Sequence, residues 1–237
     1  MKQLLLAAAT AAEIGPFLDH LAPFRCPGPE NRYQTGNYRI DVCITGVGMM
    51  AAAFRLGQVL SAGSFDLAIQ AGIAGSFDRS IPLGSLAAVV SELQGDLGAE
   101  DREQYLDIFS LGFAGKDTFP FSGGQLRNTA LPDLAQGLPQ LSSMTVNTVS
   151  GHQPTIDARS ARFGCSLESM EGAAFHYACL MTGTPFLQLR AVSNYVEPRN
   201  RAAWQIGAAI HTLNDFLLRH LGNTNPEPAP FPDQKEQ

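Results

Sequence analysis

Three polar side chains in the C-terminal third of the chain are of types that bind ligands and carry out chemistry. Glu171 is followed by Gly-Ala-Ala, three small residues typical of the start of a tightly packed helix. Arg190 and Asn194 stand at the end of an apolar run that begins at Thr184 and has the pattern of a buried strand. Strand ends are where ligands bind in open α/β sheets. A carboxylate, a guanidinium and an amide gathered there can bind a sugar diol, an anion or water, and a purine edge. This combination favours an enzyme that cleaves nucleosides.

The elements that would position these residues follow from alternating apolar and helical patterns. Strands are expected over Gln3–Ala8, Tyr38–Thr45, Leu67–Ala71, Leu86–Leu93, Thr145–Val149 and Pro185–Val192. Helices are expected over Ala12–His20, Ala51–Ser61, Thr155–Arg162, Met170–Thr182 and Ala202–Leu221. The alternation predicts a single α/β domain, residues 1–221, with a mixed, mostly parallel central sheet flanked by helices. The proline-rich, polar residues 222–237 are predicted to be a disordered tail.

Composition and charge limit both the class of protein and the kinds of partner it can bind. The 237 residues are 45% hydrophobic and 16% charged, which suits one domain with a sizeable core. A net charge of −6 without a basic stripe argues against nucleic acid. Four scattered cysteines show no metal or redox spacing, so no metal and four reduced thiols in a cytoplasmic protein are expected. The apolar stretch after Lys2 is too short to span a membrane, and we interpret it as a first strand rather than a signal peptide.

Two glycine-containing loops follow apolar strands. The first, Gly46-Val-Gly48, opens a helix whose exposed N–H groups favour an anion, although a tight turn packed on the sheet explains it equally well. It lacks the third glycine of a dinucleotide fingerprint, and no acidic residue ends the next strand, so no cofactor is expected. The second loop runs from Ala71 through Gly72 and Gly75. Two such loops at adjacent strand ends predict a shallow cleft for a flat ring.

Six ordered motifs together resemble the purine nucleoside phosphorylase / methylthioadenosine nucleosidase superfamily. They are Glu13 after the first strand, Gly46-x-Gly48, Ala71-Gly72-x-Ala74-Gly75, Val149-Ser150-Gly151, Ser169-Met170-Glu171-Gly172-Ala173-Ala174 and Arg190-Ala191-Val192-Ser193-Asn194. Within it, residues 169–177 and 193–204 look most like those of the futalosine hydrolases. The resemblance implies removal of hypoxanthine from futalosine on a route to menaquinone.

The resemblance also implies roles in a reaction through an oxocarbenium-like ribosyl transition state. Glu171 would bind the ribose hydroxyls, with Met170 packing under the sugar. Glu13 would act as general base for water, and Arg190 would orient the water or that carboxylate. Each role has a structural alternative. Glu171 could stabilise a helix dipole, Glu13 could be an exposed glutamate in the first turn of a helix, and Arg190 could be an ion-pair partner.

Asn194 discriminates between purines. The resemblance places an aspartate at this position in adenine-cleaving nucleosidases, where it can protonate N7. An amide cannot act as a general acid, but its NH₂ group can donate to N7 and to a carbonyl at position 6. Asn194 therefore favours a 6-oxopurine, the alternative being an asparagine that caps a turn.

Three further residues are expected to line the substrate: Gly75, Ile73 and Pro154. Ile73 stands where related nucleosidases have a serine, and Pro154 stands where they often present an aromatic ring to the base. Phe175 or Phe109 are alternative stacking residues. Trp204 is expected to be a packing anchor, and Arg102 or Arg79 could meet the carboxyphenyl end of futalosine.

Other functions stay open at this point. The enzyme alternatives are a methylthioadenosine/adenosylhomocysteine nucleosidase, which Asn194 disfavours, and a purine nucleoside phosphorylase, which Glu13 disfavours. A non-catalytic nucleotide-binding module would leave Glu171, Arg190 and Asn194 unexplained. The irregular residues 98–140 could line an interface, and a homo-oligomer is expected.

Overall fold

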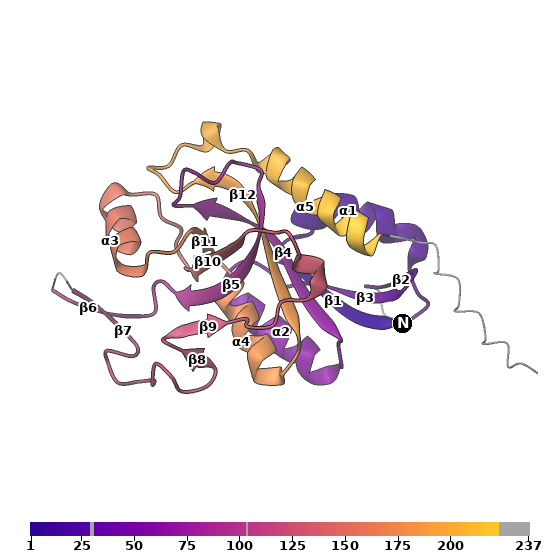
Figure 1. The fold of residues 1–237 in the computed structure, drawn as a ribbon, viewed down its shortest axis with the longest axis horizontal. Coiled ribbons are helices and arrows are strands. Elements are labelled where there is room, and N and C mark those ends of the chain that lie inside the picture. The colour runs from indigo at the N-terminus through magenta and orange to yellow at the C-terminus, as the bar shows by residue number, and fades with distance from the viewer. Residues whose placement is uncertain (29–30, 103, 223–237) are drawn as a thin grey trace, which may run out of the picture.

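The computed structural model describes residues 1–28, 31–102 and 104–222, which fold into one α/β body (Figure 1). Ten strands of these described residues form the main sheet: β1 (Lys2–Ala8), β2 (Arg32–Thr35), β3 (Tyr38–Ile44), β4 (Leu67–Ser76), β5 (Leu86–Gln94), β8 (Phe121–Ser122), β9 (Gln125–Arg127), β10 (Gln140–Thr145), β11 (Leu167–Ser169) and β12 (Phe186–Tyr195). The helices are α1 (Gly15–Leu21), α2 (Met49–Ala62), α3 (Gln153–Phe163), α4 (Gly172–Thr182) and α5 (Ile206–Leu221).

The sheet is mixed, and part of it closes on itself. β12 lies between β4 and β5, parallel to the first and antiparallel to the second. β11 and β10 join β4 and β5 on their other sides, so five strands close into a small barrel. The longest ladders, β1 with β3 and β4 with β12, are parallel. The predicted fold class, an α/β domain with a mixed and mostly parallel sheet between helices, is confirmed.

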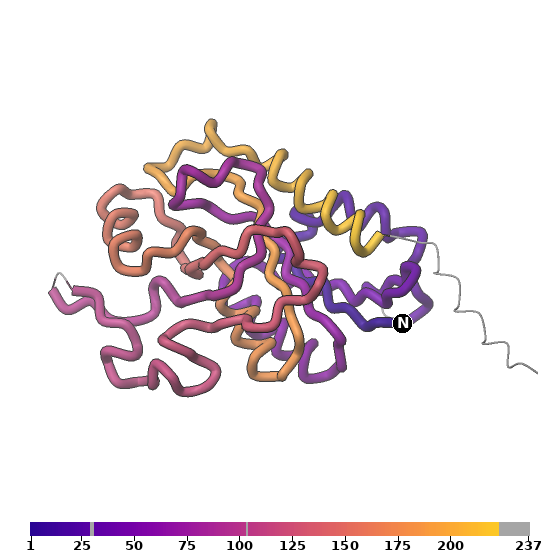
Figure 2. Tube along the Cα trace, viewed as in Figure 1, coloured from indigo at the N-terminus to yellow at the C-terminus, as the bar shows by residue number. Residues whose placement is uncertain are grey.

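Helices cover both faces of the sheet around β1. Leu4 and Leu6 pack in the core beneath α1 and α5, whereas Leu5 and Ala7 pack in a second core beneath α2 and α4. Successive side chains of a strand point to opposite faces, which produces this division. Figure 2 shows the first and last helices, α1 and α5, side by side on one face. Burial on both faces explains why these strands are nearly continuous apolar runs.

The strand predicted over Thr145–Val149 is wrong. The strand at this place is β10, which ends at Thr145, and the following residues turn toward β11. This strand was not recognised from hydrophobicity because it contains the polar residues Gln140, Ser142 and Ser143, although Ser143 is fully buried. β11 was not predicted because three residues, one of them Glu168, are too short a run to recognise.

Helix starts also differ from the prediction. α4 begins at Gly172 with Glu171 as its N-cap residue. The helix predicted from Ala202 begins only at Ile206, because the N–H of Gln205 donates to the carbonyl of Ser193 at 2.7 Å and holds the preceding residues in a separate turn.

The irregular region 98–140 contains a hairpin of β6 (Gly98–Asp101) and β7 (Gln104–Asp107) that projects from the body (Figures 1 and 2). No helix within the described part of the chain has the length and apolar character needed to cross a membrane. α5 ends at Leu221, and the predicted tail after Gly222 lies outside the described residues.

Candidate active site

Four predicted site residues come together from three separate segments. β1, β4 and β12 are neighbouring parallel strands, so their C-terminal ends meet at one edge of the sheet. Glu13 follows β1 in the 3₁₀ turn η1 (Ala11–Ile14), and β12 carries Arg190 and Asn194. Glu171 reaches the same edge from the start of α4.

These segments surround a cavity of about 330 Å³. Six of the predicted site residues line it: Glu13, Ile73, Gly75, Met170, Glu171 and Asn194. Arg190 lies beneath this lining, only 1% exposed. The cavity is concave and partly apolar with convergent polar groups, as small-molecule sites are.

Glu13 is held in place from several sides. Its Oε2 accepts hydrogen bonds from the N–H and the hydroxyl of Thr10 at 2.9 and 3.2 Å, and its Oε1 accepts one from the N–H of Ile73 at 3.2 Å. Asn214 of α5 donates to the carbonyl of Glu13 at 2.9 Å. With 9% of its surface exposed, Glu13 presents an oriented carboxylate to the cavity.

Glu171 occupies the anion position that the first glycine loop creates. Its Oε1 accepts a hydrogen bond from the N–H of Gly48 at 2.9 Å, and its Oε2 lies 3.7 Å from a guanidinium nitrogen of Arg190. Gly46 and Gly48 have φ values of 82° and 94°, which favour glycine. Burial raises the pKa of Glu171, while Arg190 and the Gly48 N–H act against this shift. The loop is therefore both a tight turn and part of the site.

Arg190 links the strand ends under the cavity. Its guanidinium donates to Oε1 of Gln70 at 3.1 Å and to the carbonyl of Ile73 at 3.3 Å. A Cβ atom added to Gly72 would overlap this guanidinium and lie 3.0 Å from Oε1 of Glu13. The missing side chain at Gly72 thus lets Arg190 and Glu13 approach the same point.

The amide of Asn194 has a defined orientation. Its Oδ1 accepts a hydrogen bond from the hydroxyl of Ser193 at 2.9 Å, and its Nδ2 donates to the carbonyl of Tyr195 at 3.0 Å. A carbonyl can only accept, so the NH₂ group must face Tyr195. A Cβ at Gly75 would lie 3.1 Å from this Nδ2, so a glycine makes room for the amide. Among the described residues, Nδ2 of Asn194 donates only this one of its two N–H groups.

The expected stacking residues lie elsewhere. Pro154 lines a different cavity, of about 670 Å³, next to the β6–β7 hairpin. Phe175 is fully buried and packs edge-on against Phe186, and Phe109 packs edge-on against Phe121. Trp204, expected to be a packing anchor, lines the site cavity instead.

Sequence reasoning missed two charged residues of the lining, Glu168 and Arg199. The buried carboxylate of Glu168 accepts hydrogen bonds from the N–H and hydroxyl of Ser150 at 2.7 and 2.6 Å and pairs with Arg159 at 3.3 Å. Glu168 thereby fixes the loop that follows β10. The available signal was that Glu168 and Met170 are two residues apart, a spacing that places side chains on one side of an extended segment. This signal was missed because strand β11 was not recognised.

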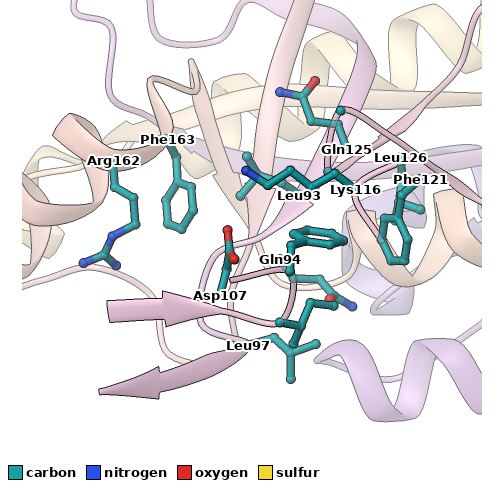
Figure 3. A pocket seen from close by; sticks show the side chains of 14 residues that line it. Leu93, Gln94, Leu97, Asp107, Lys116, Phe121, Gln125, Leu126, Arg162 and Phe163 are labelled. Atoms are coloured by element: carbon teal, nitrogen blue, oxygen red, sulfur yellow. The ribbon is translucent and has the colours of Figure 1, made fainter. Parts of the chain in front are cut away.

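A further cavity of about 170 Å³ lies near the β8–β9 hairpin (Figure 3). Its lining includes Asp107, Lys116 and Phe163, and also Phe109, which was an alternative stacking residue, but none of the residues that line the site cavity. In the part of the chain that the structure describes, no three His, Cys, Asp or Glu side chains are grouped to hold a metal ion.

Comparison with known proteins decides the family. The family model described as "Phosphorylase superfamily" matches residues 3–219. The chain belongs to this superfamily. The superfamily predicted from the six ordered motifs is thereby confirmed.

Within the phosphorylase superfamily, the chain is 35% identical over 182 residues to the futalosine hydrolase of Streptomyces coelicolor, covering 75% of this chain and 76% of the relative. The predicted likeness to the futalosine hydrolases is therefore confirmed. The fold of this chain is similar to that of a mutant of the Helicobacter pylori nucleosidase MTAN with 5′-methylthioadenosine in the active site. The TM-score is 0.75 at 18% sequence identity, and the match covers 92% of this chain and 97% of that chain. The native futalosine hydrolase of H. pylori has a TM-score of 0.71 at 18% identity, with coverage of 91% and 95%. These structural likenesses concern the fold of the superfamily.

Proposed function

We propose that this chain hydrolyses the N-ribosidic bond of futalosine, releasing hypoxanthine and leaving dehypoxanthine futalosine on a route to menaquinone. The observation that carries the proposal is the single cavity lined by Glu13, Glu171 and Asn194. It surrounds one substrate with a candidate base, a hydroxyl acceptor and an amide donor. The identity to the S. coelicolor futalosine hydrolase supports the choice of substrate.

Glu171 is proposed to bind the ribose. A carboxylate can accept charge-assisted hydrogen bonds from both hydroxyls of a cis-diol. Its Oε1 is anchored by Gly48, and its Oε2 faces Arg190 at 3.7 Å, so remaining lone pairs can point to the sugar. Met170, also in the lining, would pack under the ring.

Glu13 and Asn194 are proposed to act at the two ends of the breaking bond. The C1′–N9 bond breaks with its electron pair on the purine, and the oxygen of water bonds to C1′. Glu13 accepts the proton that water loses. The free N–H of Asn194 donates to the departing 6-oxopurine, whose negative charge it stabilises.

The charges of the cavity favour water over phosphate. Glu13, Glu168 and Glu171 are buried carboxylates of the lining. A phosphate beside the ribose would be repelled by these groups, whereas a water molecule would not. This argument favours a hydrolase over a phosphorylase.

The test is to incubate the protein with futalosine, inosine or methylthioadenosine, with and without phosphate, and to follow the free base by chromatography. We expect hypoxanthine from futalosine at the same rate with and without phosphate. Adenine from methylthioadenosine, or a requirement for phosphate, would contradict the proposal.

We further propose that the enzyme is a cytoplasmic homo-oligomer. All four cysteines are free, which suits a reducing compartment. Val47 lines the cavity yet is 56% exposed, and the nearby Met50 and Phe54 are 86% and 64% exposed. A second copy would cover these apolar side chains.

A further inference from the structure

Arg199 and Trp204 line the site cavity, and Arg201 lies beside the ring of Trp204, the one tryptophan of the chain. The guanidinium carbons of Arg199 and Arg201 lie 5.4 and 5.9 Å from the centre of the Trp204 ring. Trp204 is partly buried, whereas both arginines are exposed. We call these three residues the arginine rim.

The rim contrasts in charge with the cavity behind it. The buried part of the lining contains the carboxylates of Glu13, Glu168 and Glu171. Among the described residues of the lining, Arg199 is the only lysine or arginine. A negatively charged part of a substrate is therefore repelled from the cavity floor and attracted to the rim.

The carboxylates of Glu168 and Glu197 line a small neighbouring cavity together with Arg199, but both are paired with other arginines. Neighbouring arginines are paired, Arg79 with Glu197 and Arg159 with Glu168. None of the ion pairs found among the described residues includes Arg199 or Arg201. Both guanidiniums lie near the same ring, so both charges would attract an anion that binds beside Trp204.

The backbone holds the rim at the cavity. The N–H of Arg199 donates to the carbonyl of Gly151 at 3.3 Å, and that of Trp204 donates to the carbonyl of Arg201 at 3.3 Å. The N–H of Gln205 then donates to the carbonyl of Ser193, next to Asn194. These bonds fix Arg199 and Trp204 beside β12 in the wall of the site cavity.

We propose that Arg199 and Arg201 bind a carboxylate on an aromatic tail of the substrate, with the Trp204 indole packing against the tail. The inference rests on the proposed function, since futalosine carries a carboxyphenyl group on its sugar side. Guanidinium groups suit carboxylates because their planar fork can donate two parallel hydrogen bonds. Of the arginines considered from sequence, Arg79 is already paired with Glu197, and Arg102 lines the separate cavity with Pro154.

A comparison of futalosine with its carboxyl methyl ester tests the rim. For the wild-type protein we expect kcat/KM to be about tenfold or more higher for the acid, mainly through KM, because the ester removes a charge-assisted contact. The R199Q/R201Q variant should cleave both compounds with similar kcat/KM, and R199K should keep part of the preference. Arg219→Gln, the same change on the exposed side of α5, should behave like the wild type.

A preference for the acid that survives in R199Q/R201Q, or no preference in the wild type, would overturn the inference. If the wild type cleaved neither compound, the proposed function would fail, and fluorescence of Trp204, the one tryptophan, would still decide the rim. 3-Methylbenzoate should then quench this emission in the wild type, unlike neutral 3-methylbenzamide, and the effect should disappear in R199Q/R201Q. Equal quenching by both probes would contradict a carboxylate site.

Discussion

At the residue scale, the orientation of the Asn194 amide is fixed by one neighbour that donates to it and one that accepts from it. Ser193 donates to its oxygen, and the carbonyl of Tyr195 accepts from its nitrogen. The side chain therefore offers a donor to the cavity. Both N7 and the 6-oxo group of hypoxanthine are acceptors, so the fixed orientation supports the proposed preference for a 6-oxopurine.

We predict that Asn194→Asp lowers kcat/KM for futalosine by about tenfold or more, because an ionised carboxylate would face two purine acceptors and lose the donated hydrogen bond. Steady-state kinetics of hypoxanthine release measure this effect. The control is Asn37→Asp in an exposed turn, which adds the same charge. An unchanged rate in Asn194→Asp would remove this residue from base recognition.

Substitution of Glu13 should slow the chemical step without weakening the binding of the substrate. We predict that Glu13→Gln lowers kcat by about 100-fold or more, as expected for loss of a general base, while KM changes little. Glu100→Gln on the exposed β6 strand is the matched control. Thermal unfolding of both variants must be followed, because the amide cannot accept from all three donors that hold the Glu13 carboxylate. Substantial turnover by a folded Glu13→Gln protein would argue against this role.

At the element scale, the start of α4 is joined to the barrel by a buried polar network. Thr145 of β10 accepts from the N–H of Ala173 at 2.7 Å and donates to Glu92 of β5 at 2.9 Å. Glu92 also accepts from Gln188 of β12 at 2.7 Å, and burial raises the pKa of Glu92. A side chain at Gly172 would overlap Glu92. This network sets where α4 begins and therefore where Glu171 lies.

His176 of the same helix should make stability depend on pH. Its Nδ1 lies 3.1 Å from the carbonyl of Leu126, and burial lowers its pKa to about 3. Above the unfolded pKa of about 6.5 both states are neutral, so the full stability is present. As the pH falls from about 6.5 toward 3, only the unfolded chain binds the proton, and the free energy of unfolding falls by up to about 1.4 kcal/mol per pH unit.

We therefore predict that His176→Asn, whose amide can still donate to Leu126, shows a shallower loss of stability between pH 6.5 and 4 than the wild type. Urea unfolding at several pH values measures the two slopes. Glu92 and the other buried acids are common to both proteins, so the difference isolates His176. Equal slopes would contradict a neutral buried histidine.

At the scale of the whole molecule, the exposed apolar residues of α2 lie next to the site cavity. Met50 and Phe54 are one helical turn apart on the surface of α2. We predict that M50E/F54E shifts the protein from an oligomer toward the monomer, because two apolar side chains that a second copy would cover become charged. Sedimentation velocity measures the distribution, with Gln34→Glu on strand β2 as a charge control. A monomeric wild type would contradict the proposed oligomer.

Much of the fold was predictable because strands buried on both faces are apolar runs that glycines and helix signals separate. This holds for β1, β3 and β5, whose predicted and observed ranges nearly coincide. β10 and β11 were not predictable, since Ser143, Glu168 and Ser169 are buried although they are polar, so that these strands do not form apolar runs.

The family, the α/β class and the chemical types of the central residues could be predicted from the residues alone, because Glu13, Glu171 and Asn194 stand in ordered motifs beside recognisable strand ends. The contacts of these residues and their common cavity depend on the tertiary fold. The partner of the Gly48 N–H is 123 residues away in Glu171, and Arg199 and Trp204 reach the cavity through a turn that the helical pattern concealed. Local patterns report what each segment prefers, whereas contacts between distant segments depend on how the sheet closes and which buried polar groups must be satisfied.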